Sequence, residues 1–196
     1  MGNRSVLNPR ILKGKYRMKS IPVVEPARPP LARVRRVIFD MIESRHTIEN
    51  ALDLCCGSGS LGLEAISRGA KHVTFVDNNR DNIYNLKQTL ETWAIETNII
   101  DSVANLCVVD ARKIKLEKHF DTIFIDLPFF TECEADILQN LVNNTMISHG
   151  ALVVVKTNRK TSLNIMEGFD LLKYKQEGKS ALYLLQFTDN NLSEQS

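Results

Sequence analysis

Four aspartates each end a short apolar segment of the sequence, and their positions suit polar chemistry at a shared site. Asp53, Asp77, Asp110 and Asp126 close the segments ALD, FVD, VVD and FID. Burial stabilises a carboxylate only if it finds a partner, so packing alone does not explain the pattern. The carboxyl ends of parallel strands meet at one edge of a sheet, which is where open α/β folds bind ligands. The sequence therefore predicts a ligand site at that edge.

The first of these segments leads into a glycine-rich turn, DLCCGSGSLG, at residues 53–62. Gly57, Gly59 and Gly62 match the spacing G-x-G-x-x-G, which brings a ligand close to the backbone beside the positive end of a helix. Such a turn fits either a dinucleotide or S-adenosylmethionine (AdoMet). In both cases Asp77 is placed for the ribose hydroxyls and Asp110 for the adenine amino group. The predicted cofactor-binding residues are Asp53, Gly57, Ser58, Gly59, Asp77, Asn78, Asp110 and Ala111.

Apolar periodicity predicts the elements that would position these residues. A helix is expected from Leu31, directly after Pro30. Alternating strands and helices follow, with strands at 50–54, 72–76, 106–109, 122–125 and 151–156 and helices at 61–68, 80–93 and 135–142. Segments 169–175 and 181–187 read as an antiparallel hairpin. The pattern predicts an α/β, Rossmann-like sheet that is mostly parallel and covered on both faces, with a small hairpin around Gly14 at residues 10–24 in front of it.

The charge distribution divides the chain. Residues 1–36 hold ten lysines and arginines and one acid, Glu25, whereas the remainder is net acidic. A basic segment gains free energy by displacing the counterions of phosphates, so we expect a nucleic-acid partner. We expect a basic extension at 1–36, the catalytic domain at 37–188 and a frayed tail at 189–196. The candidate contacts to nucleic acid are Arg10, Lys13, Lys15, Arg17, Arg28 and Arg33.

Composition argues against several other classes. No apolar run approaches the roughly 20 residues that span a bilayer, and MGNRSVLNPR lacks the apolar stretch of a secretory signal. The four cysteines form no C-x-x-C pair and the four histidines are scattered, so we expect no metal site and reduced thiols. We expect a cytoplasmic monomer.

Longer motifs carry a family resemblance. RILKGKYR at 10–17, DLCCGSGSLGLEAISRGA at 53–70, HVTFVDNN at 72–79, FDTIFIDLPF at 120–129 and GKSALYLLQF at 178–187 resemble the RsmD-type 16S ribosomal RNA guanine-N2 methyltransferases. The resemblance implies AdoMet-dependent methylation of a guanine amino group, with ribosomal RNA or a small ribosomal subunit particle as partner. Asp126 and the Leu127 carbonyl would accept the amino N–H bonds, Pro128 would stiffen the turn, and Phe129 would stack on the extruded base.

The sequence departs from the family pattern at two places. Leu127 replaces the first proline of the signature [D/N/S]-P-P-[Y/F/W], and residues 28–32 read RPPLA where the family has Arg-Pro-Thr-Thr-Asp. Three alternatives stay open: an adenine-N6 methyltransferase acting on DNA or RNA, a catalytically impaired RNA-binding homologue, and an NAD(P)-dependent oxidoreductase. The last would leave both the Asp126 motif and the basic segment unexplained.

Overall fold

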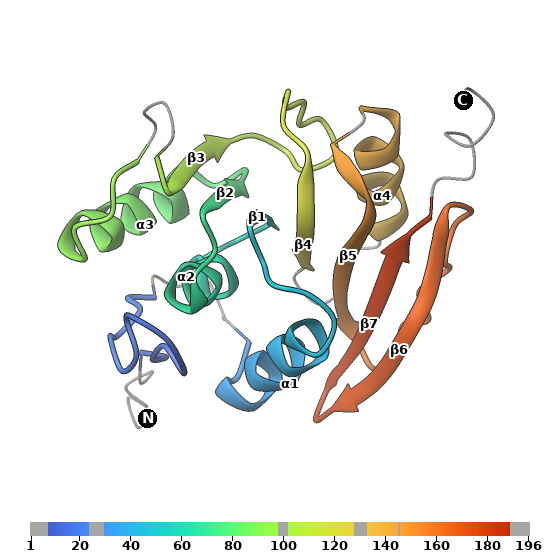
Figure 1. The fold of residues 1–196 in the computed structure, drawn as a ribbon, viewed down its shortest axis with the longest axis horizontal. Helices are drawn as coiled ribbons and strands as arrows, with labels where there is room; N and C mark the ends of the chain where they lie inside the picture. Colours follow the sequence, from blue (N-terminus) through green and yellow to red (C-terminus); the bar gives the residue numbers. More distant parts are fainter. Residues whose placement is uncertain (1–7, 24–29, 98–101, 128–132, 145, 189–196) are drawn as a thin grey trace, which may run out of the picture.

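The computed structural model describes residues 8–23, 30–97, 102–127, 133–144 and 146–188, which form a sheet with helices on both faces (Figure 1). The strands are β1 (Asn50–Leu54), β2 (His72–Asp77), β3 (Ala104–Val108), β4 (Phe120–Asp126), β5 (Ile147–Asn158), β6 (Phe169–Glu177) and β7 (Ser180–Phe187). The helices are α1 (Ala32–Glu43), α2 (Ser60–Arg68), α3 (Arg80–Thr92) and α4 (Glu134–Asn143).

The strand order is β3-β2-β1-β4-β5-β7-β6. Neighbours from β3 to β5 pair in parallel, and β7 pairs antiparallel with both β5 and β6. This arrangement confirms the predicted Rossmann-like sheet and its C-terminal hairpin. It also brings the carboxyl ends of the parallel strands to one edge.

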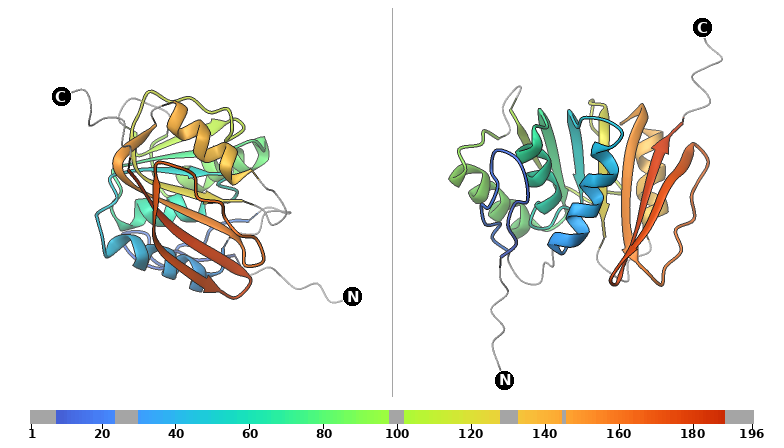
Figure 2. Two further views of the ribbon diagram at one scale, coloured as in Figure 1. Left: turned by 90° about the vertical axis from the view of Figure 1, so that its right-hand side faces the viewer. Right: turned by 60° about the horizontal axis from the view of Figure 1, so that its bottom comes forward.

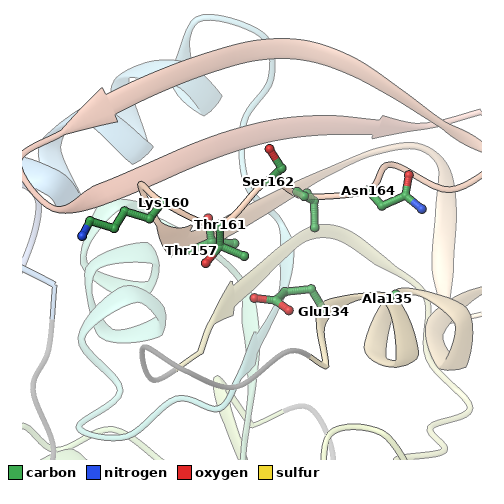
Figure 3. Close-up of a pocket in the computed structure, with 8 residues that line it drawn as sticks. Glu134, Ala135, Thr157, Lys160, Thr161, Ser162 and Asn164 are labelled. Carbon is green, nitrogen blue, oxygen red and sulfur yellow. The ribbon is translucent and has the colours of Figure 1, made fainter.

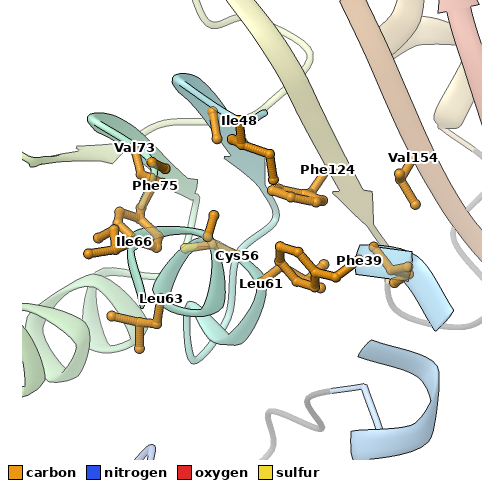
Figure 4. Close-up of a cluster of buried hydrophobic side chains, with 14 of the residues drawn as sticks. Phe39, Ile48, Cys56, Leu61, Leu63, Ile66, Val73, Phe75, Phe124 and Val154 are labelled. Carbon is orange, nitrogen blue, oxygen red and sulfur yellow. The ribbon is translucent and has the colours of Figure 1, made fainter. Parts of the chain in front are cut away.

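Apolar side chains alternate between the two faces of the sheet, because successive residues of a strand point in opposite directions. On one face, Phe75 and Phe124 pack with residues of α1, α2 and α3, such as Phe39 (Figure 4). On the other face, Ile123 and Ile125 pack with residues of α4. Two covered faces explain why these strands read as continuous apolar runs.

Most predicted elements are confirmed to within a few residues, although β5 begins four residues earlier than predicted, and the edge strand β3 is also shifted. It begins at Ala104 and ends at Val108, so Asp110 lies two residues beyond the strand. The pairing with β2 starts at the buried Ala104 and passes through the polar Asn105, whereas Val108 is largely exposed. The apolar run Leu106–Val109 therefore marks only part of this edge strand.

The predicted N-terminal hairpin is present as an irregular, antiparallel turn without two regular strands. Within residues 8–23 the chain makes turns and one isolated antiparallel bridge, between Arg10 and Ser20, and no strand. Several amides pair across the turn: Ile21 N donates to the Pro9 carbonyl at 2.8 Å, and Ile11 N donates to the Lys19 carbonyl at 3.0 Å. Other amides reach across to α2. Leu12 N and Lys13 N donate to the Glu64 carboxylate at 2.8 and 3.1 Å, and Lys15 N donates to the Ser67 carbonyl at 2.8 Å.

We call residues 8–23 the arm. It is part of the folded body rather than a solvated tail, since Ile11 and Ile21 are fully buried in the core. Figure 2 shows the arm lying beside α2. The turn at Gly14 fits so closely that an added Cβ would lie 1.7 Å from the Ser67 carbonyl oxygen. Its φ of +88° also favours glycine.

Candidate active site

Charged side chains gather on one face of the sheet at the carboxyl ends of its strands. Asp53 in β1, Asp77 in β2 and Asp126 in β4 each lie two residues after a core residue of the α1–α3 face: Ala51, Phe75 and Phe124. Strand alternation therefore places the three carboxylates on that same face. The three acids thus lie on one face of the sheet at the predicted edge, and their binding of a ligand stays a prediction.

The glycine-rich turn connects β1 to α2 in a conformation that only some residues adopt. Gly57 and Gly59 have φ of +54° and +70°, and Cys55 is held in the left-handed region with φ of +56°. No atom lies within 4 Å of the position that a Cβ on Gly57 would occupy, so the turn is open at that point. The hydroxyl of Ser58 is buried, and within the described part of the chain it has no hydrogen-bond partner.

Two of the acids hold this turn in place. Asp53, which is 1% exposed, accepts a 2.8 Å hydrogen bond from Gly62 N in the first turn of α2. Asp77 accepts from Gly57 N at 2.8 Å and from Asn79 N at 2.9 Å. Burial raises the pKa of Asp53 well above its usual value, and the nearby Asp126 and Asp77 charges act in the same direction. The acids therefore form one electrostatic unit.

Asp110 lies past the end of β3 and already has a cation. The Arg112 guanidinium donates to both carboxylate oxygens, at 3.0 and 2.6 Å, and lowers the pKa of Asp110 to about 2. To meet an adenine amino group, Asp110 would have to share an oxygen with Arg112. Two further predicted cofactor residues directly follow these acids in the chain. Asn78, after Asp77, is exposed, and Ala111, after Asp110, is packed into the α4 face of the core.

Asp126 forms an ion pair with Lys156, a residue that sequence reasoning missed. The two residues are register partners on the parallel strands β4 and β5, and Lys156 Nζ donates to Asp126 Oδ1. Burial raises the pKa of Asp126, and the Lys156 ammonium partly opposes this shift. The sequence held one sign of this residue, because the apolar run Ala151–Val155 ends directly on a lysine, as other strands end on an aspartate.

A pocket of about 440 Å³ lies beside these strand ends, between the start of α4 and the chain that follows β5 (Figure 3). It is lined by Glu134, Ala135, Thr157, Lys160, Thr161, Ser162, Leu163 and Asn164. Thr157 follows Lys156 in β5, so its side chain lies on the α4 face. The pocket and the Asp126–Lys156 pair thus share the edge but lie on opposite faces of the sheet.

Several predicted site residues are placed elsewhere or not at all. Pro128, Phe129 and Arg28 lie outside the described residues. Leu127 is 4% exposed and belongs to the α4-face core, so side-chain packing holds the backbone where the family has a proline ring. Arg33 lies in α1, outside the arm, and pairs with Glu177 at 2.7 Å.

Within the arm, the ammonium groups of Lys15 and Lys19 lie over the Tyr16 ring, at 5.2 and 5.3 Å from its centroid. Tyr16 stacks on Trp93 at 5.4 Å. Lys13 pairs with Glu43 at 3.0 Å on the exposed surface. The lysine side chains of the arm are exposed. The arm therefore presents cations and aromatic rings together.

The described residues contain neither a cluster of metal ligands nor a helix that could span a membrane. In the ranges that the structure covers, no three histidine, cysteine, aspartate or glutamate side chains cluster as metal ligands. All four cysteines fall within those ranges and are free thiols. No helix among the residues described is long and apolar enough to cross a membrane.

The geometry fits the cofactor that the sequence predicts. The open backbone at Gly57, the unpartnered Ser58 hydroxyl and the Asp77 carboxylate all lie at the β1 and β2 strand ends. A nucleoside with a charged tail needs hydrogen-bonding partners of these kinds. The comparison with known proteins decides the family: residues 9–186 match a family model described as "Conserved hypothetical protein 95", the RsmD family. The chain belongs to the RsmD family.

Relatives in the RsmD family have informative names. The chain is 31% identical over 171 residues to ribosomal RNA small subunit methyltransferase D of Haemophilus influenzae, covering 86% of this chain and 89% of that protein. It is 27% identical to the Escherichia coli K12 protein of the same name over 190 residues, covering 90% and 89%.

Solved structures agree. A structure named "putative methyltransferase" from Escherichia coli superposes with a TM-score of 0.81 at 26% identity, covering 92% of this chain and 98% of that one. A "putative methylase" from Haemophilus influenzae gives a TM-score of 0.78 at 28% identity, covering 93% and 99%. The Rossmann-like methyltransferase fold is therefore shared along nearly the whole chain.

Proposed function

We propose that this RsmD-family protein methylates the exocyclic N2 amino group of a guanine in small-subunit ribosomal RNA, using AdoMet. The observation that carries the proposal is the placement of Asp126, from the signature D-L-P-F, on the same face and edge as Asp53 and Asp77 of the cofactor turn. The names of the relatives support ribosomal RNA as the substrate class. A cytoplasmic monomer acting on RNA or on a small ribosomal subunit particle completes the proposal.

In this proposal, Asp77 binds the ribose hydroxyls, Ser58 and the open turn at Gly57 bind the methionine part, and Asp110 accepts from the adenine amino group. AdoMet supplies a methyl carbon on a positively charged sulfur: the amino nitrogen bonds to this carbon, the carbon–sulfur bond breaks with its electron pair left on sulfur, and the nitrogen loses one proton. The chain's part is to orient the amino group. Asp126 and the Leu127 carbonyl accept its two N–H bonds and expose the nitrogen lone pair.

The test has two parts, a binding measurement and a methyl-transfer measurement. AdoMet, or its demethylated product, should raise the melting temperature, whereas NAD should not, which separates a methyltransferase from an oxidoreductase. Labelled AdoMet with ribosomal RNA or small-subunit particles should then label one guanine, found by mapping the modified base. Label on adenine would favour the N6 alternative, and binding without transfer would favour an impaired homologue.

The variant Asp126→Ala tests the role of this carboxylate in methyl transfer. It should leave AdoMet affinity nearly intact and lower single-turnover methyl transfer on the order of a hundredfold or more, as expected for loss of a positioned polar group. Transfer near the wild-type rate would exclude the amino-orienting role. The matched check is calorimetric titration of AdoMet into the variant.

We further propose that the arm contacts RNA through Arg10, Lys13, Lys15 and Arg17. Replacing these four by Glu should weaken RNA binding and flatten its salt dependence, since each neutralised phosphate contributes roughly one unit of slope. A matched control replaces Lys173, Lys175 and Lys179, exposed on β6 and the turn after it, by Glu. Equal effects in both variants would indicate a general charge effect, and no effect in either would place the RNA elsewhere.

A further inference from the structure

The ion pair between Asp126 and Lys156 is nearly closed to solvent. The two side chains are 13% and 9% exposed, on strand positions that pair directly at the ends of β4 and β5. Lys156 lies two residues after Val154, so like Asp126 it points to the α1–α3 face that carries Asp53 and Asp77. The pair therefore belongs to the same cluster as the cofactor turn.

Stability alone is a weak reason for this pair. Removing two charges from water costs free energy that their mutual attraction only roughly repays, and apolar replacements of buried pairs are often neutral or stabilising. A lysine at this strand end, directly bonded to the carboxylate of the methyltransferase signature, is better explained by what it does to that carboxylate.

We propose that Lys156 is a positioning residue for methyl transfer: it holds Asp126 ionised through Oδ1 and leaves Oδ2 to accept an N–H of the substrate's amino group. This inference rests on the proposed function, because it assigns a role within the same reaction. The Lys156 ammonium also fixes the rotamer of Asp126, since the carboxylate is tied to the neighbouring strand at one oxygen.

The pair has a chemical consequence for the proton that the amino nitrogen must lose. A carboxylate stabilised by an adjacent ammonium is a good hydrogen-bond acceptor but a weak base. Asp126 therefore orients the N–H bond and polarises it, and the released proton passes to water. Without Lys156, burial would raise the pKa of Asp126 further, so the carboxylate would be lost at a higher pH.

Two other titratable groups lie near Asp126. Asp53, from β1, lies close enough for the negative charge of Asp126 to add to the effect of burial in raising the pKa of Asp53. Cys55, from the turn after β1, is neutral, since burial raises its pKa to about 12. Burial itself raises the pKa of Asp126. The Lys156 ammonium opposes the effect of burial and favours the ionised form of Asp126.

The experiment compares Lys156→Met and Lys156→Arg with wild type, with Lys173→Met on exposed β6 as the matched control. Two measurements are made: the pH dependence of single-turnover methyl transfer to ribosomal RNA, and the NMR titration of the Asp126 carboxyl carbon in protein without RNA. In Lys156→Met, the Asp126 titration and the acid limb of the rate profile should both move to higher pH. Transfer below neutral pH should fall on the order of tenfold for each unit of that movement.

Lys156→Arg, which keeps the charge, should restore most of the rate and the position of the acid limb, and Lys173→Met should match wild type. A purely structural role would lower the rate equally at all pH values and leave the Asp126 titration in place, which would overturn the proposal. Should Lys156→Met fail to fold, Lys156→Gln carries the same comparison, because it keeps a donor without the charge. If wild type transfers no methyl group to RNA, the proposed function fails, and the NMR titration still decides whether Lys156 controls Asp126.

Discussion

Replacing Glu64 by Ala should unfold the arm from the body and cost much of the stability of the protein. Glu64 is fully buried in α2, where its carboxylate accepts hydrogen bonds from Leu12 N, Lys13 N and Arg68 Nε. No other side chain is hydrogen-bonded to both of these arm amides in the described structure. The variant therefore removes the acceptor and leaves the donors without it.

The magnitude follows from these contacts. Removing one partner of a buried pair costs about 3–5 kcal/mol, because a charged group stays buried without compensation. Arg68 keeps a second partner, Glu43, at 2.8 Å, which places the expected loss of unfolding free energy near the lower end. A loss of about 3 kcal/mol corresponds to a fall in melting temperature of roughly 6–12 °C for a chain of this size.

Urea denaturation followed by circular dichroism measures the loss, and hydrogen exchange at the Leu12 and Lys13 amides locates it. Glu43→Ala serves as the control: its partially exposed carboxylate also pairs with Arg68, yet it should cost less than about 1 kcal/mol. If Glu64→Ala costs no more than Glu43→Ala, the arm is not held by Glu64, and its docking on α2 in solution would be refuted.

Asp77→Ala should weaken AdoMet binding by about 1–3 kcal/mol, the scale of hydrogen bonds to a charged group, and unchanged affinity by calorimetry in a folded variant would exclude the ribose assignment. Gly62→Ala should lower the unfolding free energy by about 1–3 kcal/mol in urea, because its Cβ would lie 2.2 Å from the Phe75 ring; wild-type stability would contradict the close packing. Arg112→Ala should raise the pKa of Asp110 from about 2 toward about 3.9, as followed by NMR. Since the pKa of Asp110 is lower in the folded protein, the stabilisation from this pair is present above the unfolded pKa and is lost as the pH falls toward about 2. An unchanged Asp110 titration in the variant would exclude Arg112 as the cause of the shift.

The sequence predicts the sheet because its strands have no polar alternation. The runs that became β1, β2 and β4 are apolar on both faces, which is the signature of a covered parallel sheet. The same logic located the strand-end acids Asp53, Asp77 and Asp126, since a polar residue closing an apolar run is visible in the linear chain. Asp110 was misplaced relative to β3, because an edge strand is only partly buried and its apolar run understates its length.

What the sequence did not reveal depends on contacts between distant segments. Glu64 looks like an ordinary polar residue of a helix until the arm, 51 residues away, places its amides against it. The prediction of a hairpin at residues 10–24 missed its contacts with α2 for the same reason, since a local pattern cannot show that some of its amides donate to Glu64 and Ser67. Lys156 was taken as the end of a strand, and only the register of β4 on β5 sets it opposite Asp126.

Helix α2 has a mechanical consequence for substrate choice. It begins beside the glycine turn at Ser60 and ends at Arg68 next to the arm, so the arm's turn and the cofactor turn sit at the two ends of one nine-residue helix. At about 1.5 Å per residue, that helix sets a spacing of roughly 13 Å with no joint between. An RNA bound by the arm would therefore lie at a fixed distance from the cofactor turn. Under the proposed function, the modified base would be the one that the folded RNA presents at that distance, whatever bases surround it.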